Sequence, residues 1–229
     1  TYVLKAPSAN FAEDPVYLNG FIREKWVGRR LKHPGLMKVF PSRDNSPFLY
    51  FLFEPVRGQT LRAWLIANPK PALTEVRDIL NEVISALRAM HRMGMVHRDL
   101  KPENIMITHQ GHVKLIDFGT VQVAGLDDVS SPIEESFSVG SVNYSAPEMV
   151  LENQATSQSD IYSLGVIIYD LLAGQRPYKD KTNSHRRPAS LSDWQYETLK
   201  NSRPDLPLWV NSALETACAA HVRHRYGVM

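Results

Sequence analysis

A few polar residues near the middle of the chain have the types that phosphoryl transfer needs. Asp99 is placed to accept the proton of an incoming hydroxyl, and Lys101 can offer its ammonium to the transferring group. Asn104 and Asp117 carry hard oxygen donors of the kind that Mg²⁺ prefers. Each residue alone is more simply a solvated loop charge. Together, between short predicted strands, they indicate a site for chemistry on a phosphate group.

The order of these residues along the chain matches a known signature. The block His97-Arg98-Asp99-Leu100-Lys101-Pro102-Glu103-Asn104, followed by Asp117-Phe118-Gly119, resembles the H-R-D-L-x-x-x-N and D-F-G motifs of eukaryotic-type protein kinases. The resemblance covers nearly the whole chain. It implies ATP and Mg²⁺ as cofactors and Ser or Thr hydroxyls of protein substrates as acceptors, with Asn104 and Asp117 holding the metal.

The first strand is expected to supply a residue for the phosphates. Residues 2–5 read Y-V-L-K and resemble the V-A-I-K strand of kinases, which makes Lys5 the candidate. Its partner is expected to be Glu24, in the middle of the following helix, because Glu13 precedes that helix. The resemblance implies that this ion pair holds Lys5 against the α- and β-phosphates of ATP.

Residues 51–56 resemble the strand that leads into the hinge between the two kinase lobes. The resemblance implies that Phe53 is the gatekeeper and that the Glu54 carbonyl and the Val56 amide meet adenine. It also implies that Val3 and Met106 sandwich the base. Simple core packing stays an open interpretation of those last two residues.

Residues 144–148 resemble the A-P-E motif that closes the activation segment of kinases. The resemblance implies an ion pair between Glu148 and Arg225. It also implies that Asp160, at the start of a helix that is apolar on all sides, braces the backbone of the catalytic loop.

Lys101 is typical of Ser/Thr kinases, and Ser141 stands where these often carry Thr. Arg98, directly before the catalytic Asp, implies control by phosphorylation, since an arginine can bind a phosphate with two hydrogen bonds. We therefore expect autophosphorylation within the Ser-rich residues 120–143. The candidate sites are Ser136 and Ser138, followed by Ser130 and Ser131.

Two further stretches point to a bacterial origin. Residues 21–24 and 31–34 look like bacterial Hanks-type kinases, and residues 117–126 with 132–134 are similar to kinase domains fused to PP2C-type phosphatases. A fused or partner PP2C-type phosphatase is thus expected, although these residues hold no phosphatase motif.

Hydrophobic patterns predict the elements that position these residues. Asp14 is expected to cap a helix that runs to about Lys32, and Thr74 to cap a strongly amphipathic one. The expected strands lie at residues 1–5, 36–40, 48–54, 105–107 and 113–116, and two more helices at 160–173 and 207–220.

The fold is therefore expected to be α+β, a bilobal kinase domain over residues 1–229. A small β-rich N-lobe would take residues 1–55 and a larger helical C-lobe residues 56–229. No Gly-rich loop precedes the Lys5 strand and the chain does not begin with Met. We expect the chain to be a piece of a longer protein, cut before the Lys5 strand so that the first two strands are missing; the alternative is a protein that truly lacks the loop. In either case these 229 residues are expected to bind ATP weakly.

Composition excludes several classes of function. The 229 residues carry 26 basic and 24 acidic side chains, so there is no basic excess to suggest a nucleic-acid partner. The single cysteine rules out an intrachain disulfide framework, and no apolar run is long enough to span a membrane. A cytoplasmic location is expected.

Three other interpretations compete with an active protein kinase. One is a non-catalytic pseudokinase that acts as a scaffold or nucleotide sensor, against which the full set of Lys, Glu, Asp, Asn and Asp argues. Another is a small-molecule kinase, which the Ser-rich segment closed by Ala-Pro-Glu disfavours. The third is the kinase half of a bifunctional kinase and phosphatase.

Overall fold

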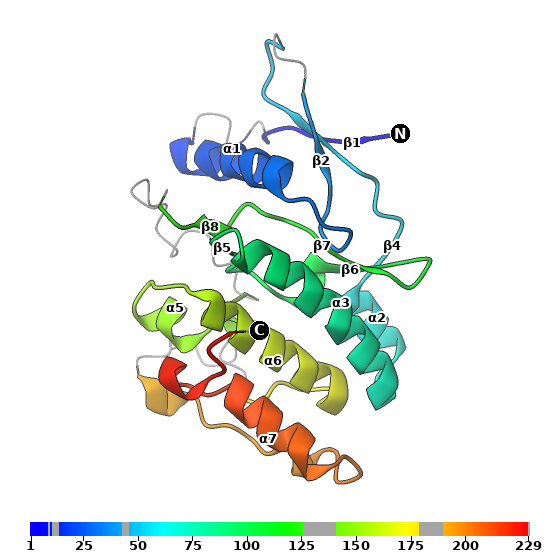
Figure 1. Ribbon diagram of the computed structural model, residues 1–229, viewed down its shortest axis with the longest axis vertical. Coiled ribbons are helices and arrows are strands. Elements are labelled where there is room, and N and C mark those ends of the chain that lie inside the picture. The colour runs from blue at the N-terminus through cyan, green and yellow to red at the C-terminus, as the bar shows by residue number, and fades with distance from the viewer. Residues whose placement is uncertain (9, 11–13, 43–45, 126–140, 179–189, 229) are drawn as a thin grey trace.

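The computed structural model describes the chain except residues 9, 11–13, 43–45, 126–140, 179–189 and 229. The fold is α+β. A small sheet and helix α1 lie at one end of the molecule, and most helices gather at the other end (Figure 1).

The small sheet is antiparallel, with strand order β1-β3-β2. Its central strand β3 carries Phe51 and Phe53, which pack with Phe21 of the neighbouring helix and Val39 in a separate apolar cluster. Asp14 Oδ1 accepts a hydrogen bond from the Tyr17 amide at 3.2 Å, as expected for the start of that helix. The elements are β1 (Val3–Lys5), α1 (Pro15–Arg30), β2 (Val39–Phe40) and β3 (Phe51–Phe53).

A second sheet, of order β4-β6-β7, carries the central motifs. Its hairpin pairs Ile105 with Leu115, and the Ile116 amide donates to the Asn104 carbonyl at 3.0 Å. The residues before β6 and those after β7 therefore meet at one end of the hairpin. The strands are β4 (Gly58–Thr60), β6 (Ile105–Thr108) and β7 (Val113–Leu115), and a separate pair joins β5 (Met95–Val96) to β8 (Gln122–Val123).

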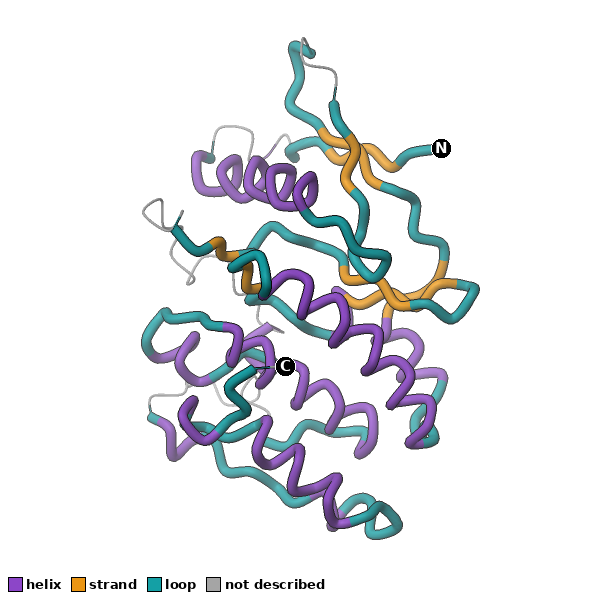
Figure 2. Tube along the Cα trace, viewed as in Figure 1, coloured by secondary structure: helices purple, strands orange, loops and turns teal. Residues whose placement is uncertain are grey.

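Among the described residues, helices are more extensive than strands, and most of them lie in the larger part of the molecule (Figure 2). Helix α6 is buried around most of its circumference and packs against α3 and α7, as its apolar sequence predicted. Gly165 permits this packing, because a Cβ there would lie 2.9 Å from Ala217 Cβ and Cys218 Sγ. The helices are α2 (Leu61–Ala67), α3 (Leu73–His91), α5 (Pro147–Leu151), α6 (Ser157–Ala173) and α7 (Leu208–Ala217).

Some predicted helix boundaries were wrong. Thr74 is not the cap of α3, because the helix already begins at Leu73 and the Glu75 carboxylate accepts a hydrogen bond from the Ala72 amide at 2.8 Å. The first helix ends two residues before Lys32, and α7 ends at Ala217 rather than at residue 220. The periodicity of apolar residues does not fix the end of a helix to within one or two residues.

Candidate active site

The turn before β6 brings three predicted site residues into contact. Lys101 Nζ lies 2.7 Å from Asp99 Oδ2, and Asn104 Nδ2 donates to that same oxygen at 3.0 Å. The same side-chain nitrogen, Asn104 Nδ2, also donates to the Asp99 backbone carbonyl at 2.8 Å. The turn Pro102–Asn104 is a short 3-10 helix with its proline in the first position, which suits the fixed φ of that residue. The Asp99 carboxylate is thus held by two donors on one oxygen.

Asp117 lies across the hairpin from this turn. Its backbone has φ of 65°, in the left-handed region, and its Oδ1 accepts from the Gly119 amide at 3.3 Å. Such a conformation costs energy for a residue other than glycine and is typical of functional sites. Because the amide nitrogen of Asn104 donates to Asp99, the amide oxygen is the atom that could meet a cation. Asn104 and Asp117 therefore fit a Mg²⁺ ion, which usually takes few protein ligands.

Asp160 supports the residues just before the turn. It is fully buried, and its two carboxylate oxygens accept from the backbone amides of His97 at 2.9 Å and Arg98 at 3.0 Å. His91 Nε2 lies 2.7 Å from the same carboxylate. Arg98 has φ of 71°, so these bonds hold a strained backbone in place directly before Asp99.

Asp160→Asn is expected to lower the free energy of unfolding by about 1–3 kcal/mol, since an amide NH₂ cannot accept from a backbone amide and leaves a buried group without its partner. Urea denaturation followed by circular dichroism measures this loss. The control is Asp205→Asn, at an exposed carboxylate that pairs with Arg203. Equal stability of the two variants would contradict the bracing role.

The ion pair expected between the first strand and helix α1 is present. Lys5 Nζ lies 2.6 Å from Glu24 Oε2, and the Glu24 residue is only 3% exposed. Burial raises the pKa of the Glu24 carboxyl, Lys5 opposes this rise, and the nearby charge of Asp117 adds to it. The charges of Lys5 and Asp117 thus both act on the Glu24 carboxyl.

The five residues expected around adenine come from both sheets and from the loop between β3 and β4. Phe53 is buried in the apolar cluster of the small sheet, and Val3, opposite it on β1, is about half exposed. Met106 belongs to the other sheet and is half-buried. The Glu54 side chain accepts from Lys114 Nζ at 2.6 Å and from the Lys38 amide at 2.9 Å, a contact between the two sheets that the sequence patterns did not indicate. Val56 follows directly after Pro55 in a loop.

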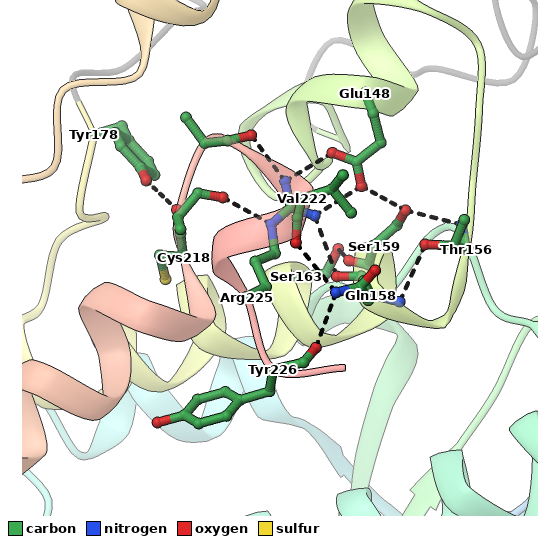
Figure 3. Close-up of polar contacts among 12 residues, drawn as sticks. Glu148, Thr156, Gln158, Ser159, Ser163, Tyr178, Cys218, Val222, Arg225 and Tyr226 are labelled. Carbon is green, nitrogen blue, oxygen red and sulfur yellow. Dashed lines mark hydrogen bonds and ion pairs between the residues drawn. The ribbon is translucent and has the colours of Figure 1, made fainter. Parts of the chain in front are cut away.

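The expected pair between Glu148 and Arg225 is present as a bidentate contact (Figure 3). Arg225 Nη1 donates to Glu148 Oε1 and Nη2 donates to Glu148 Oε2, each at 2.7 Å. Ser159 Oγ also donates to Glu148 Oε1 at 2.7 Å. The Arg225 side chain is completely buried and also donates to three backbone carbonyls. This network ties the last residues of the chain to the start of helices α5 and α6.

The expected phosphorylation sites Ser130, Ser131, Ser136 and Ser138 lie outside the described residues, as does the side chain of Ser141. A cluster around Arg62, which sequence analysis missed, joins α2 to α6 and to the turn Pro102–Asn104, called the catalytic turn below. No sequence pattern indicated this cluster, because helix α2, which carries Arg62 in its first turn, was not predicted.

Comparison with known proteins identifies this arrangement. Residues 2–227 match the protein kinase domain family. The chain belongs to that family. This kinase domain is 32% identical to the serine/threonine-protein kinase PrkC of Bacillus subtilis over 220 residues, which are 95% of this chain and 33% of that protein. It is 30% identical to a probable serine/threonine-protein kinase PknB of Lactococcus lactis over 223 residues, 97% of this chain and 35% of that protein.

A third relative is the serine/threonine-protein kinase PknL of Mycobacterium bovis, 36% identical over 175 residues, 76% of this chain and 43% of that protein. The kinase domain spans about a third of the length of the PrkC and PknB relatives. These matches place it with the bacterial Hanks-type kinases. Among the residues that the structure describes, no helix is both long and apolar enough to cross a membrane.

Proposed function

We propose that this kinase domain transfers the γ-phosphoryl group of ATP to Ser or Thr hydroxyls of proteins. The observation that carries the proposal is the carboxylate of Asp99, which Lys101 and Asn104 hold through one oxygen at 2.7 and 3.0 Å. A carboxylate held this way keeps a fixed direction while its second oxygen remains to accept a proton.

In this proposal Asp99 takes the proton of the acceptor hydroxyl. The hydroxyl oxygen forms a bond with the γ-phosphorus as the bond to the β-phosphate oxygen breaks, which leaves ADP. The ammonium of Lys101 stabilises the charge on the moving group. Lys5, held by Glu24 at 2.6 Å, binds the phosphates that leave with ADP.

The site is proposed to use Mg²⁺ together with ATP. Asn104 and Asp117 would be its protein ligands, and a bound Mg²⁺ supplies neutralisation of the phosphate charge. The adenine site is proposed to consist of Val3 on β1, Phe53 on β3, Met106 on β6, and Glu54 and Val56 in the loop between β3 and β4.

Several features support protein substrates with Ser or Thr acceptors. Lys101 is typical of Ser/Thr kinases, and the relatives that the chain resembles are named as such. Four further expectations stay predictions: autophosphorylation within residues 120–143, a PP2C-type phosphatase as fused or separate partner, a cytoplasmic location, and a lobe boundary between residues 55 and 56.

Lys5→Met is expected to slow phosphoryl transfer to a Ser/Thr protein substrate by about 10²–10³-fold, because it removes a charge from the phosphates and leaves buried Glu24 without its partner. The assay follows phosphate transfer from radiolabelled MgATP to a generic basic protein. Lys32→Met, at an exposed position just after α1, serves as the control.

The same assay tests the alternative of a pseudokinase scaffold. Such a protein would bind nucleotide without transferring phosphate, and Lys5→Met would then change binding alone. No transfer by the unaltered chain, and none by the full-length protein, would favour that alternative.

A further inference from the structure

Beside the catalytic turn, one guanidinium fills a site made of three oxygen groups. Arg62 Nε lies 2.9 Å from Glu103 Oε1, and its Nη1 lies 3.2 Å from Asp170 Oδ2. Its Nη2 donates to the Tyr144 hydroxyl, which in turn donates to Asp170 Oδ2 at 2.6 Å. Three separate parts of the chain therefore meet on a single side chain: the catalytic turn, helix α6 and the segment just before α5.

Local structure holds Arg62 in this position. It is the second residue of α2, a helix capped by Thr60, whose Oγ1 accepts from the Ala63 amide at 3.1 Å. Leu61 and Leu65 of that helix are buried. The backbone of Arg62 is thus anchored on both sides, and its side chain spans the distance to the three oxygen groups.

The site has an excess of negative charge without Arg62. The side chain of Asp170 is 8% exposed and that of Glu103 is 47% exposed, so one carboxylate is buried and one faces solvent. Burial, together with the charge of Asp170, raises the pKa of Tyr144, which keeps its hydroxyl protonated. Without Arg62, a buried carboxylate would lose its charge partner, which is costly, and the site would favour another cation.

The place of this site bears on substrate binding. Glu103 stands between Lys101 and Asn104 in the turn that holds Asp99, and Tyr144 directly follows the residues that close the Ser-rich segment. A protein substrate with its hydroxyl at Asp99 lies next to this turn, and an extended segment advances about 3.3 Å per residue. A side chain a few residues from the acceptor therefore comes within reach of the Glu103 carboxylate.

We propose that Arg62 is a specificity-determining residue, whose guanidinium fills an anionic subsite formed by Glu103, Asp170 and Tyr144 and so prevents that subsite from selecting a basic side chain of the substrate. This inference rests on the proposed kinase function. The subsite has the chemistry of an arginine site, since two carboxylates and a hydroxyl offer directional acceptors to a planar guanidinium. The chain itself supplies the arginine, and the kinase does not require one near the acceptor.

The test compares two sets of serine peptides. One set carries arginine at each position from four before to four after the serine, and the other carries the neutral isostere citrulline there. Dissociation constants are measured by calorimetry without nucleotide, and kcat and KM with MgATP. Arg62→Met removes the guanidinium and keeps much of the side-chain stem. Since Arg176 also lies 5.7 Å above the Tyr144 ring and could enter the vacated site, the double variant Arg62→Met with Arg176→Met is measured as well.

The expected result is a preference that appears only in the variants. The unaltered chain binds arginine and citrulline peptides about equally, and the variants favour arginine at one position by about tenfold or more, through KM rather than kcat. Adding Glu103→Gln to Arg62→Met reduces the preference. The matched control Arg77→Met removes an arginine from an exposed ion pair on α3 and leaves the ratio unchanged.

Equal binding of both peptide sets by the folded variants, or an arginine preference in the unaltered chain, would overturn the inference. Arg62→Lys, which keeps a charge but cannot bond all three groups, gives an intermediate ratio and replaces Arg62→Met if that variant does not fold. Because binding is measured without nucleotide, the two proposals fail separately. A chain that transfers no phosphate while its variants bind arginine peptides contradicts only the proposed function.

Discussion

Asp99→Asn is expected to slow phosphoryl transfer by about 10²- to 10⁴-fold, the range that a positioned general base contributes. The amide that replaces the carboxylate cannot take the proton of the acceptor hydroxyl. Its shape is nearly the same, so the contacts with Lys101 and Asn104 change in charge more than in position. Single-turnover transfer to a serine peptide measures the effect, which should appear in kcat with little change in KM for ATP.

Asp78→Asn is the matched control for this change, because it neutralises an aspartate that is exposed on α3 and pairs only at the surface with Arg77. It should leave transfer unchanged. A rate for Asp99→Asn close to that of the control would show that another group takes the proton.

Arg225→Met is expected to lower the free energy of unfolding by about 3–5 kcal/mol, the usual cost of removing one partner of a buried ion pair. Glu148 would keep only the hydrogen bond from Ser159, and three carbonyls that now accept from Arg225 would lose their donor. For a domain of this size, the loss corresponds to a fall of roughly 6–20 °C in Tm. Calorimetry and urea denaturation measure both quantities.

Arg77→Met provides the comparison, since its side chain and that of Asp78 are 63% and 67% exposed. A surface pair of this kind contributes about 0–1 kcal/mol at most. If both variants lost the same small amount, the Glu148–Arg225 network would be contributing no more than a surface contact.

Sequence patterns predicted the main helices and strands well where apolar spacing is regular. Helix α3, helix α6 and the β6–β7 hairpin all lie close to their expected ranges. Short elements such as α2, β4 and α5 escaped, because a segment of three to seven residues is too short to show a period. Tertiary contacts, rather than local propensity, decide whether such segments form.

The same limit applies to the site. The ion pairs Lys5–Glu24 and Glu148–Arg225 could be predicted because the resemblance to protein kinases implies both partners. The contact of Lys114 with Glu54 could not, since it joins residues from two sheets whose packing no local pattern encodes. Arg62 is similar, because its partner Asp170 lies 108 positions away and is found only when α2 and α6 come together.

The Glu148–Arg225 pair also bears on the order of folding. It closes a loop of 77 residues, and bringing such distant segments together costs about 4 kcal/mol in chain entropy before any contact forms. Helices α6 and α7 lie inside this loop, so we expect them to pack before the pair forms. We expect the pair to form after the rate-limiting step of folding, so its loss should speed unfolding while the refolding rate stays nearly constant.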